Sequence, residues 1–187
     1  CVDKGPDTTP PEIVTTTPLN EMPIQHGLTS LDADFYVNEP SECRWSHTDK
    51  TFDSMESAMT CSTSITNMSY IGGQVAYRCR TTLTGLTDAA NKFYVKCKDQ
   101  PIGVAEADRN TNTQSYIYTL KGTQTLVIDS AGPEGVVKGP GSSIKVSLTA
   151  ETSAGFNEGE ATCYYNEKCY SSNGNVNNYI EFAYTPG

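Results

Sequence analysis

The sequence lacks the patterns that mark several large classes of protein. It contains no run of about 18 apolar residues, so we expect no membrane-spanning segment. Its cysteines form no CxxC pair and no Cys/His cluster, which argues against zinc and haem. Leucine is scarce, whereas Ser, Thr, Asn, Gly and Tyr are abundant. This balance favours short strands joined by polar turns over amphipathic helices.

Catalytic patterns are also scarce. The two histidines, His26 and His47, lie in polar, turn-like surroundings, and nothing in the sequence marks either as a general base. Asp32 and Asp34 would share one strand face, where we interpret them as surface charge rather than as a catalytic pair. The net charge of −9 argues against a nucleic-acid partner, because phosphates would be repelled. We therefore expect no enzyme and no cofactor.

Cysteine is well represented. Seven cysteines in a chain of 187 residues indicate an oxidising compartment and disulfide bonds. The positions are Cys1, Cys43, Cys61, Cys79, Cys97, Cys163 and Cys169. Because the count is odd, one cysteine needs a separate explanation. No signal peptide is recognised, and Cys1 reads as the start of a mature secreted chain, as a lipidated first residue, or as an arbitrary boundary within a longer polypeptide.

The central stretch of the chain is Glu42-Cys43-Arg44-Trp45-Ser46, where a cysteine and the single tryptophan alternate with polar residues. This alternation predicts a buried strand with Trp45 in the core. Residues 1–11 read as a proline-rich linker. Further strands are expected at 12–17, 28–37, 74–83, 91–98 and 116–120. Met55, Ala58 and Met59 follow helical spacing and predict a single helical turn.

A second module is expected to begin near Gln124. Leu126-Val127-Ile128 matches Ile13-Val14, Pro133 matches Pro18, and Ser143–Leu148 is expected as a strand. Cys163-Tyr164-Tyr165 repeats the cysteine–aromatic stretch, which indicates two related modules. No counterpart of 93–97 or of 116–120 follows. We therefore predict a first domain at 12–122 and a partial second domain at 123–187.

A family resemblance can be named from ordered motifs. Residues 7–13 (DTTPPEI), 43–46 (CRWS), 53–55 (DSM) and 93–99 (FYVKCKD) together resemble bacterial and archaeal Ig-like or fibronectin type III-like repeats of cell-surface proteins. The resemblance implies an all-β fold of tandem β-sandwich modules. It also implies that the CRWS and YVKC strands are neighbours in one sheet. The segment from Cys61 to Cys79 departs from the pattern and is interpreted as an insertion.

From this resemblance we predict a nested set of disulfides that keeps each pair within one module. Cys43 should bond to Cys97, Cys61 to Cys79 across the inserted loop, and Cys163 to Cys169. Cys1 is then left free, lipidated or bonded to another chain.

Three further sites are weighed. Asp99, Asp108 and Asp129 lie near expected strand ends, where loop oxygens could hold calcium, although no EF-hand signature is present. Asn67-Met68-Ser69 fits the glycosylation sequon. The eleven tyrosines either fill the sandwich or form an exposed face for a sugar or a protein.

The function expected from these observations is that of an extracellular structural module without enzymatic activity. It would be a repeat of a cell-surface protein or a subunit of a surface filament, and its partners would be other copies of itself or neighbouring repeats. The alternative is an adhesin that binds a glycan or a surface protein through loops and tyrosines. A third reading is an accessory domain of a secreted enzyme.

An incomplete second sandwich would leave an apolar sheet face and a strand edge uncovered. Either the chain continues beyond Gly187, or a neighbouring copy lends a strand and joins the subunits into a filament. For the second route, residues 2–14 are expected as the donor, at an edge position because of their prolines.

Overall fold

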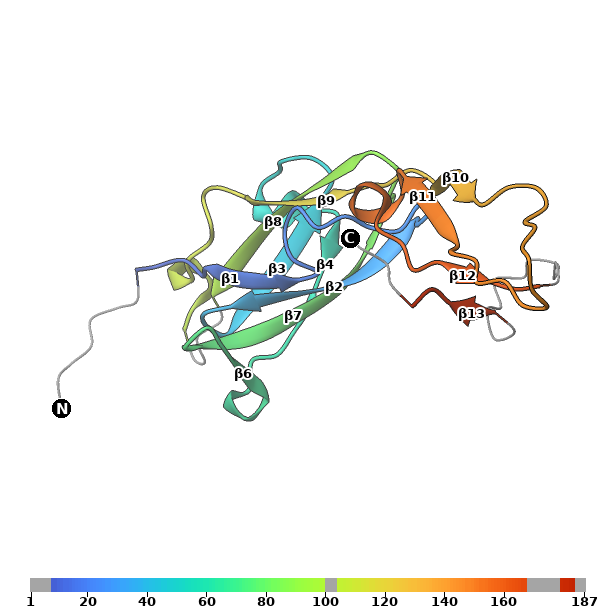
Figure 1. Ribbon diagram of the computed structural model, residues 1–187. Helices are drawn as coiled ribbons and strands as arrows, with labels where there is room; N and C mark the ends of the chain where they lie inside the picture. The colour runs from blue at the N-terminus through green and yellow to red at the C-terminus, as the bar shows by residue number, and fades with distance from the viewer. Residues whose placement is uncertain (1–7, 100–103, 168–178, 184–187) are drawn as a thin grey trace. The chain divides into compact units, whose positions relative to one another are not determined.

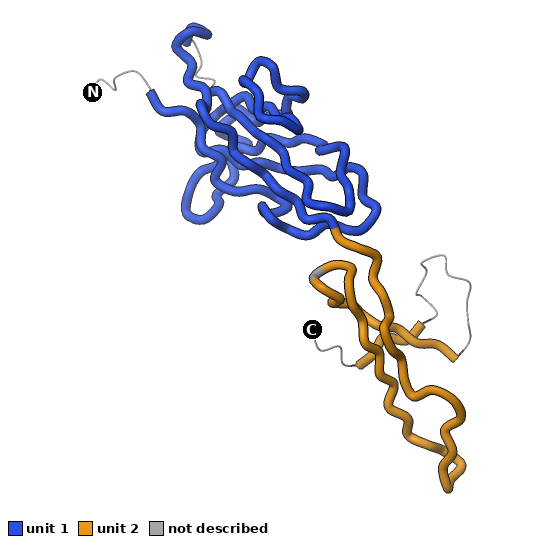
Figure 2. The backbone as a smooth tube through the Cα atoms, turned by 90° about the horizontal axis from the view of Figure 1, so that it is seen from above, with its two compact units in different colours: residues 1–122 blue, residues 123–187 orange. Residues whose placement is uncertain are grey.

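The computed structural model describes residues 8–99, 104–167 and 179–183 (Figure 1). These residues form antiparallel strands and four short 3₁₀ turns, with no α-helix among them. The chain divides into two compact units, residues 1–122 (unit 1) and residues 123–187 (unit 2), which Figure 2 colours separately. In the part of the chain described, no helix is long and apolar enough to cross a bilayer.

Unit 1 consists of two antiparallel sheets. The first has the order β1-β2-β7-β5, with β6 also paired to β7, and the second has the order β4-β3-β8-β9. The first sheet contains β1 (Ile13–Thr17), β2 (Ser30–Val37), β5 (Thr60–Cys61), β6 (Met68–Ile71) and β7 (Gln74–Thr84). The second contains β3 (Ser41–Ser46), β4 (Ser57–Ala58), β8 (Ala90–Asp99) and β9 (Tyr116–Lys121).

The core of unit 1 lies between these sheets and follows the alternation of the sequence. In β2, Phe35 and Val37 are fully buried, and in β8 Phe93 and Val95 are equally enclosed. Phe35 meets Tyr118 of β9 edge to face, with ring centroids 5.0 Å apart. Because period-two apolar residues share one face of a strand, each sheet presents one apolar face to the other. The expected all-β, sandwich-like architecture is therefore confirmed for unit 1.

The segment after β3 differs from the expected helical turn. A 3₁₀ turn, η1 (Phe52–Ser54), precedes β4, and β4 pairs with β3. Met55 and Met59 are buried while Ala58 is exposed, so the three do not share a helical face. Ser57 instead pairs with Trp45, which adds β4 to the sheet beside β3. This strand pairing outweighs the helical spacing, because a single helical turn without neighbouring turns is unstable.

The segment between Cys61 and Cys79 was expected as an insertion, and it is built into the first sheet. A 3₁₀ turn, η2 (Ile65–Asn67), leads into β6, which forms a hairpin with β7. Gly72 and Gly73 connect the two strands with φ of 58° and 87°. A two-residue hairpin turn requires positive φ at both positions, which glycine adopts without strain.

The described residues of unit 2 form two separate strand pairs. β10 (Val127–Gly132) pairs with β11 (Thr149–Ser153), and β12 (Tyr164–Tyr165) pairs with β13 (Ile180–Glu181). The strand expected at 143–148 is not formed, so that prediction was wrong. Pairing stops at Gly132↔Thr149 because Pro133 follows Gly132 and has no N–H to donate. A further 3₁₀ turn, η4 (Phe156–Gly159), lies between β11 and β12.

The two units share a detail of strand pairing at their first strands. β1–β2 and β10–β11 are both antiparallel, and in both the register shifts by one residue. The shift falls at Val14 in β1 and at Asp129 in β10. Val14 precedes Pro18, and Asp129 precedes Pro133, by the same four positions. The first two strands of each unit are thus built alike.

Candidate functional site

Four cysteines meet in the centre of unit 1. Cys43 of β3 lies opposite Cys97 of β8, and Cys61 of β5 lies opposite Cys79 of β7. Each pair is at disulfide distance, with Cα atoms 4.1 Å and 3.9 Å apart. These are the two pairs predicted for this unit. Each bond links neighbouring strands within one sheet, so neither sheet depends on the other for its crosslink.

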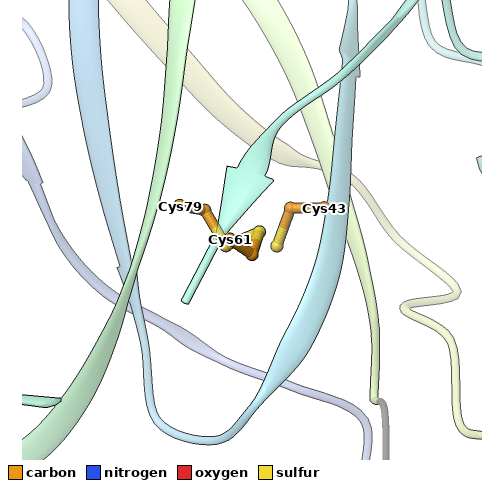
Figure 3. Close-up of side chains that lie close together, drawn as sticks. All are labelled: Cys43, Cys61 and Cys79. Carbon is orange, nitrogen blue, oxygen red and sulfur yellow. A yellow bond between two sulfur atoms is a disulfide. The ribbon is translucent and has the colours of Figure 1, made fainter. Parts of the chain in front are cut away.

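The two disulfides face each other across the sandwich. The Sγ atoms of Cys43, Cys61 and Cys79 all lie within 4.8 Å of one another. Figure 3 shows the side chain of Cys43 directed toward the bonded Cys61 and Cys79. A tetrahedral metal needs thiolates, which sulfurs already joined as disulfides do not supply. In the oxidised chain this cluster offers structural crosslinking and the geometry for thiol–disulfide exchange.

Trp45 lies beside this cluster in the core, as expected. Its side chain is 2 % exposed and meets the Phe93 ring edge to face at 5.4 Å. The indole Nε1–H donates to Thr81 Oγ1 of β7 at 2.9 Å. The indole therefore packs within its own sheet and joins it to the other sheet through this hydrogen bond, because a buried donor must find a partner. The sequence did not identify Thr81 as that partner.

His47 is held in a small ion-pair network at the surface. Its Nδ1 lies 2.7 Å from Glu56 Oε2, and its Nε2 lies 3.0 Å from the carbonyl oxygen of Thr84. The hydrogen bond with Glu56 is the main reason that the pKa of His47 is raised. Lys50 also donates to Glu56 at 2.8 Å, and this bond, followed by that from His47, lowers the pKa of Glu56 to about 2.

The other groups weighed for catalysis also have structural partners. His26 Nδ1 lies 3.2 Å from a carboxylate oxygen of Asp88. Arg80 donates two hydrogen bonds to Asp34, at 2.7 and 2.8 Å, and thereby lowers the pKa of that carboxyl. Asp32 accepts a hydrogen bond from Thr82 at 2.6 Å. Asp32 and Asp34 thus form cross-strand pairs with β7. Asp32 is exposed, as expected, whereas Asp34 is buried at 9 % exposure, so its interpretation as surface charge was wrong.

The three aspartates considered for calcium have different surroundings. Asp99 is 2 % exposed, and its two carboxylate oxygens accept hydrogen bonds from the backbone and side chain of Asn110. Asp108 lies exposed in η3 (Glu106–Asp108), and Asp129 lies exposed in β10 of unit 2. Among the residues described, the cysteine cluster alone brings three ligand atoms of Cys, His, Asp or Glu close together.

The tyrosines differ widely in burial. Tyr118 is fully enclosed and donates from its hydroxyl to the carbonyl oxygen of Pro18 at 2.9 Å. Burial raises the pKa of Tyr118. Tyr70, in contrast, is 77 % exposed, and Tyr164 and Tyr165 are 39 % and 38 % exposed. Tyr170 and Tyr184 lie outside the described residues.

Asn67 of the sequon is exposed at the end of η2. It lies on the rim of an open surface hollow of about 410 Å³. The hollow is lined by Tyr36, Ser62, Asn67, Met68, Ser69 and Arg78. Aromatic, amide and guanidinium groups in one hollow are the usual partners of polar ligands, sugars included.

The remaining cysteines bear on unit 2 and on the chain start. Cys163 precedes β12 and is half-buried, with no disulfide to another described residue. Its predicted partner Cys169 lies outside the described residues, as does Cys1, so both expectations stay predictions. Comparison with known proteins adds no assignment, because no protein-family model, curated protein or solved structure matches the chain.

Proposed function

We propose that this chain belongs to an extracellular structural protein without enzymatic activity. It would be built from tandem Ig-like or fibronectin type III-like β-sandwich modules, as a repeat of a cell-surface protein or a subunit of a surface filament. The observation that carries the proposal is the recurrence in unit 2 of the bulged strand pair of unit 1, four positions before a proline. Serial modules with one strand plan are typical of proteins that span distance.

The two crosslinks of unit 1 support the same proposal. Disulfides indicate a non-reducing environment, and both bonds lie at the centre of the core. Crosslinks between neighbouring strands limit how far a module can extend under load. The histidines and paired carboxylates are committed to ion pairs and hydrogen bonds that hold strands and loops, which suits a supporting role.

Location on intact cells tests this proposal. Antibodies against unit 1 should label unpermeabilised source cells, and protease added outside should release fragments in which Cys43–Cys97 and Cys61–Cys79 are bonded. A cytoplasmic antigen released only on lysis would check that the antibodies and protease do not enter. Labelling only after permeabilisation, with the cysteines of unit 1 reduced, would overturn the proposal.

The surface hollow beside Asn67 favours one alternative, an adhesin that binds a glycan. Tyr36 and Arg78 supply a ring and a cationic donor on its wall. A glycan array probed with the unglycosylated protein should then give hits that Arg78→Ala abolishes and that Lys138→Ala, in unit 2, leaves unchanged. Attachment of a glycan to Asn67 itself would place that sugar at the rim and compete with such a ligand.

A further inference from the structure

The second strand pair of unit 2 reproduces the pairing of β3 with β4 residue by residue. In unit 1, the two residues after Cys43 pair as Arg44↔Ala58 and Trp45↔Ser57. In unit 2, the two residues after Cys163 pair as Tyr164↔Glu181 and Tyr165↔Ile180.

The backbone around the two cysteines matches as well. The N–H of Met59 donates to the carbonyl of Cys43 at 2.9 Å, and that of Phe182 donates to the carbonyl of Cys163 at 2.9 Å. Cys163 therefore occupies the place of Cys43, and β12 occupies the place of β3.

Unit 1 shows what covers the other edge of such a strand. β8 pairs with β3 from Ser41↔Asp99 to Ser46↔Tyr94, with Cys97 opposite Cys43. Likewise, β7 covers the edge of β2 that β1 does not. Within the described part of unit 2, β12 has β13 as its one neighbour, and β11 has β10 as its one neighbour.

The side chains of unit 2 are more exposed than their counterparts in unit 1, as expected for strands with one described neighbour. Trp45, two residues after Cys43, is 2 % exposed, whereas Tyr165, two residues after Cys163, is 38 % exposed. The other large apolar side chains exposed in unit 2 are 39–83 % exposed: Leu126, Val127, Ile128, Val136, Val137, Ile144, Val146, Leu148, Phe156, Tyr164 and Ile180. Large apolar side chains exposed on and between strands that have one neighbour each are expected where another element covers them.

We infer that the free edge of β12 accepts an extended strand with the chemistry of β8. Such a strand carries apolar side chains at alternate positions, as in Phe93-Tyr94-Val95, and a cysteine two residues later that faces Cys163. This inference rests on the proposed modular function, since it concerns how the second module is completed. Main-chain hydrogen bonds along the edge would supply affinity, and the alternate apolar side chains would supply selectivity.

A disulfide between this cysteine and Cys163 would fix the register of the added strand. Two thiols and one disulfide oxidant of the glutathione class yield the Cys163 crosslink and two reduced thiols, so protons and electrons balance. This partner differs from Cys169, which was expected from the sequence. It also replaces residues 2–14 as the expected donor, because Ile13 of that segment is already paired in β1.

A synthetic peptide tests the inference on the full chain. The peptide repeats residues 90–99, and the protein carries Cys1→Ser and Cys169→Ser, so that Cys163 is the remaining cysteine outside the two disulfides of unit 1. Both are incubated in a glutathione redox buffer, trapped with acid and mapped. The expected result is a mixed disulfide between Cys163 and the peptide cysteine, at a yield about tenfold above that of a control peptide with Phe93→Ser and Val95→Ser.

Other outcomes would overturn the inference. Equal yields from the two peptides would show thiol reactivity without strand recognition. Dimers linked through Cys163 of two copies would show that a second copy covers the edge. A Cys163–Cys169 bond in the unsubstituted chain would show that the cysteine is already used. None of these results bears on where the protein is located, so the proposed function is judged separately by cell labelling.

Discussion

The indole nitrogen of Trp45 on β3 donates to the hydroxyl of Thr81 on β7, and this hydrogen bond is one of the contacts between the two sheets of unit 1. It shows why the single tryptophan lies where it does. The ring fills the core beside Phe93, and its polar atom reaches across to the opposite sheet instead of remaining unpaired. Replacing Trp45 should therefore remove packing and leave the Thr81 hydroxyl without its donor.

Trp45→Ala should lower the free energy of unfolding by about 3–5 kcal/mol, because a large aromatic side chain in a closed core is lost. Chemical denaturation followed by circular dichroism measures the change. Tyr70→Ala is the matched control, because its ring is 77 % exposed, and it should change stability by less than about 0.5 kcal/mol. Equal effects from the two substitutions would show that Trp45 does not support the core.

Cys97→Ser should cause the remaining disulfide of unit 1 to rearrange. The freed Cys43 thiol lies beside the Cys61–Cys79 bond, and its thiolate can attack either sulfur, forming one S–S bond as another breaks. Peptide mapping after prolonged incubation at alkaline pH should find part of Cys43 bonded to Cys61 or Cys79. Cys163→Ser should retain both original pairs. Complete alkylation of Cys43 beside an intact Cys61–Cys79 bond would contradict the prediction.

The His47–Glu56 pair should make stability depend on pH near neutrality. Because the pKa of His47 is raised by folding, the protonated ring stabilises the fold below its ordinary pKa of 6.5, and that contribution is lost as pH rises through the folded value. The ring is 44 % exposed, so the loss should stay below about 1 kcal/mol. Urea denaturation at several pH values measures this loss.

Glu56→Gln is the control for the histidine. It removes the carboxylate that raises the pKa of His47, so the pH dependence assigned to this residue should flatten. Titration by NMR should then show the His47 resonance midpoint moving down toward its ordinary value. An unchanged midpoint would mean that the contact with Thr84, and not Glu56, governs the protonation of this ring.

The contour length that unit 1 releases on unfolding under force should depend on whether its two disulfides are intact or reduced. The Cys43–Cys97 bond closes a separation of 54 residues, and the Cys61–Cys79 pair lies inside that loop. Full reduction should add roughly 180–190 Å to the contour length released on unfolding, at 3.3–3.6 Å per residue. Single-molecule pulling with and without reductant measures the difference. An equal contour length in both states would show that the crosslinks do not limit extension.

Much of unit 1 was predictable from local pattern. The alternation in 28–37 and 91–98 places apolar residues on one face of each strand whatever the surrounding fold, so β2 and β8 were expected close to their observed bounds. The pairing of Cys43 with Cys97 followed from a resemblance that places their strands side by side. The helical turn predicted from Met55, Ala58 and Met59 was wrong, because part of that segment forms β4 and pairs with β3.

The relations that cross between strands needed the tertiary structure. Sequence spacing places Cys43, Cys61 and Cys79 far apart along the chain, and only the stacking of two sheets brings their sulfurs within 4.8 Å. Thr81 as the partner of Trp45 depends on the same stacking. The strand expected at 143–148 likewise shows that apolar alternation predicts a strand only where a neighbour supplies hydrogen bonds.

The sequence by itself determined the all-β class, because composition and apolar alternation act along short stretches of chain, and its cysteine content indicated a non-reducing environment. The tertiary structure decided which edges of the two units are covered. A strand's second neighbour is chosen by hydrogen bonding between distant segments, which no local pattern encodes. The matching of Cys163 with Cys43 depends on the strand pairings, as does the contrast between the edge of β3 that β8 covers and the edge of β12 that no described strand covers.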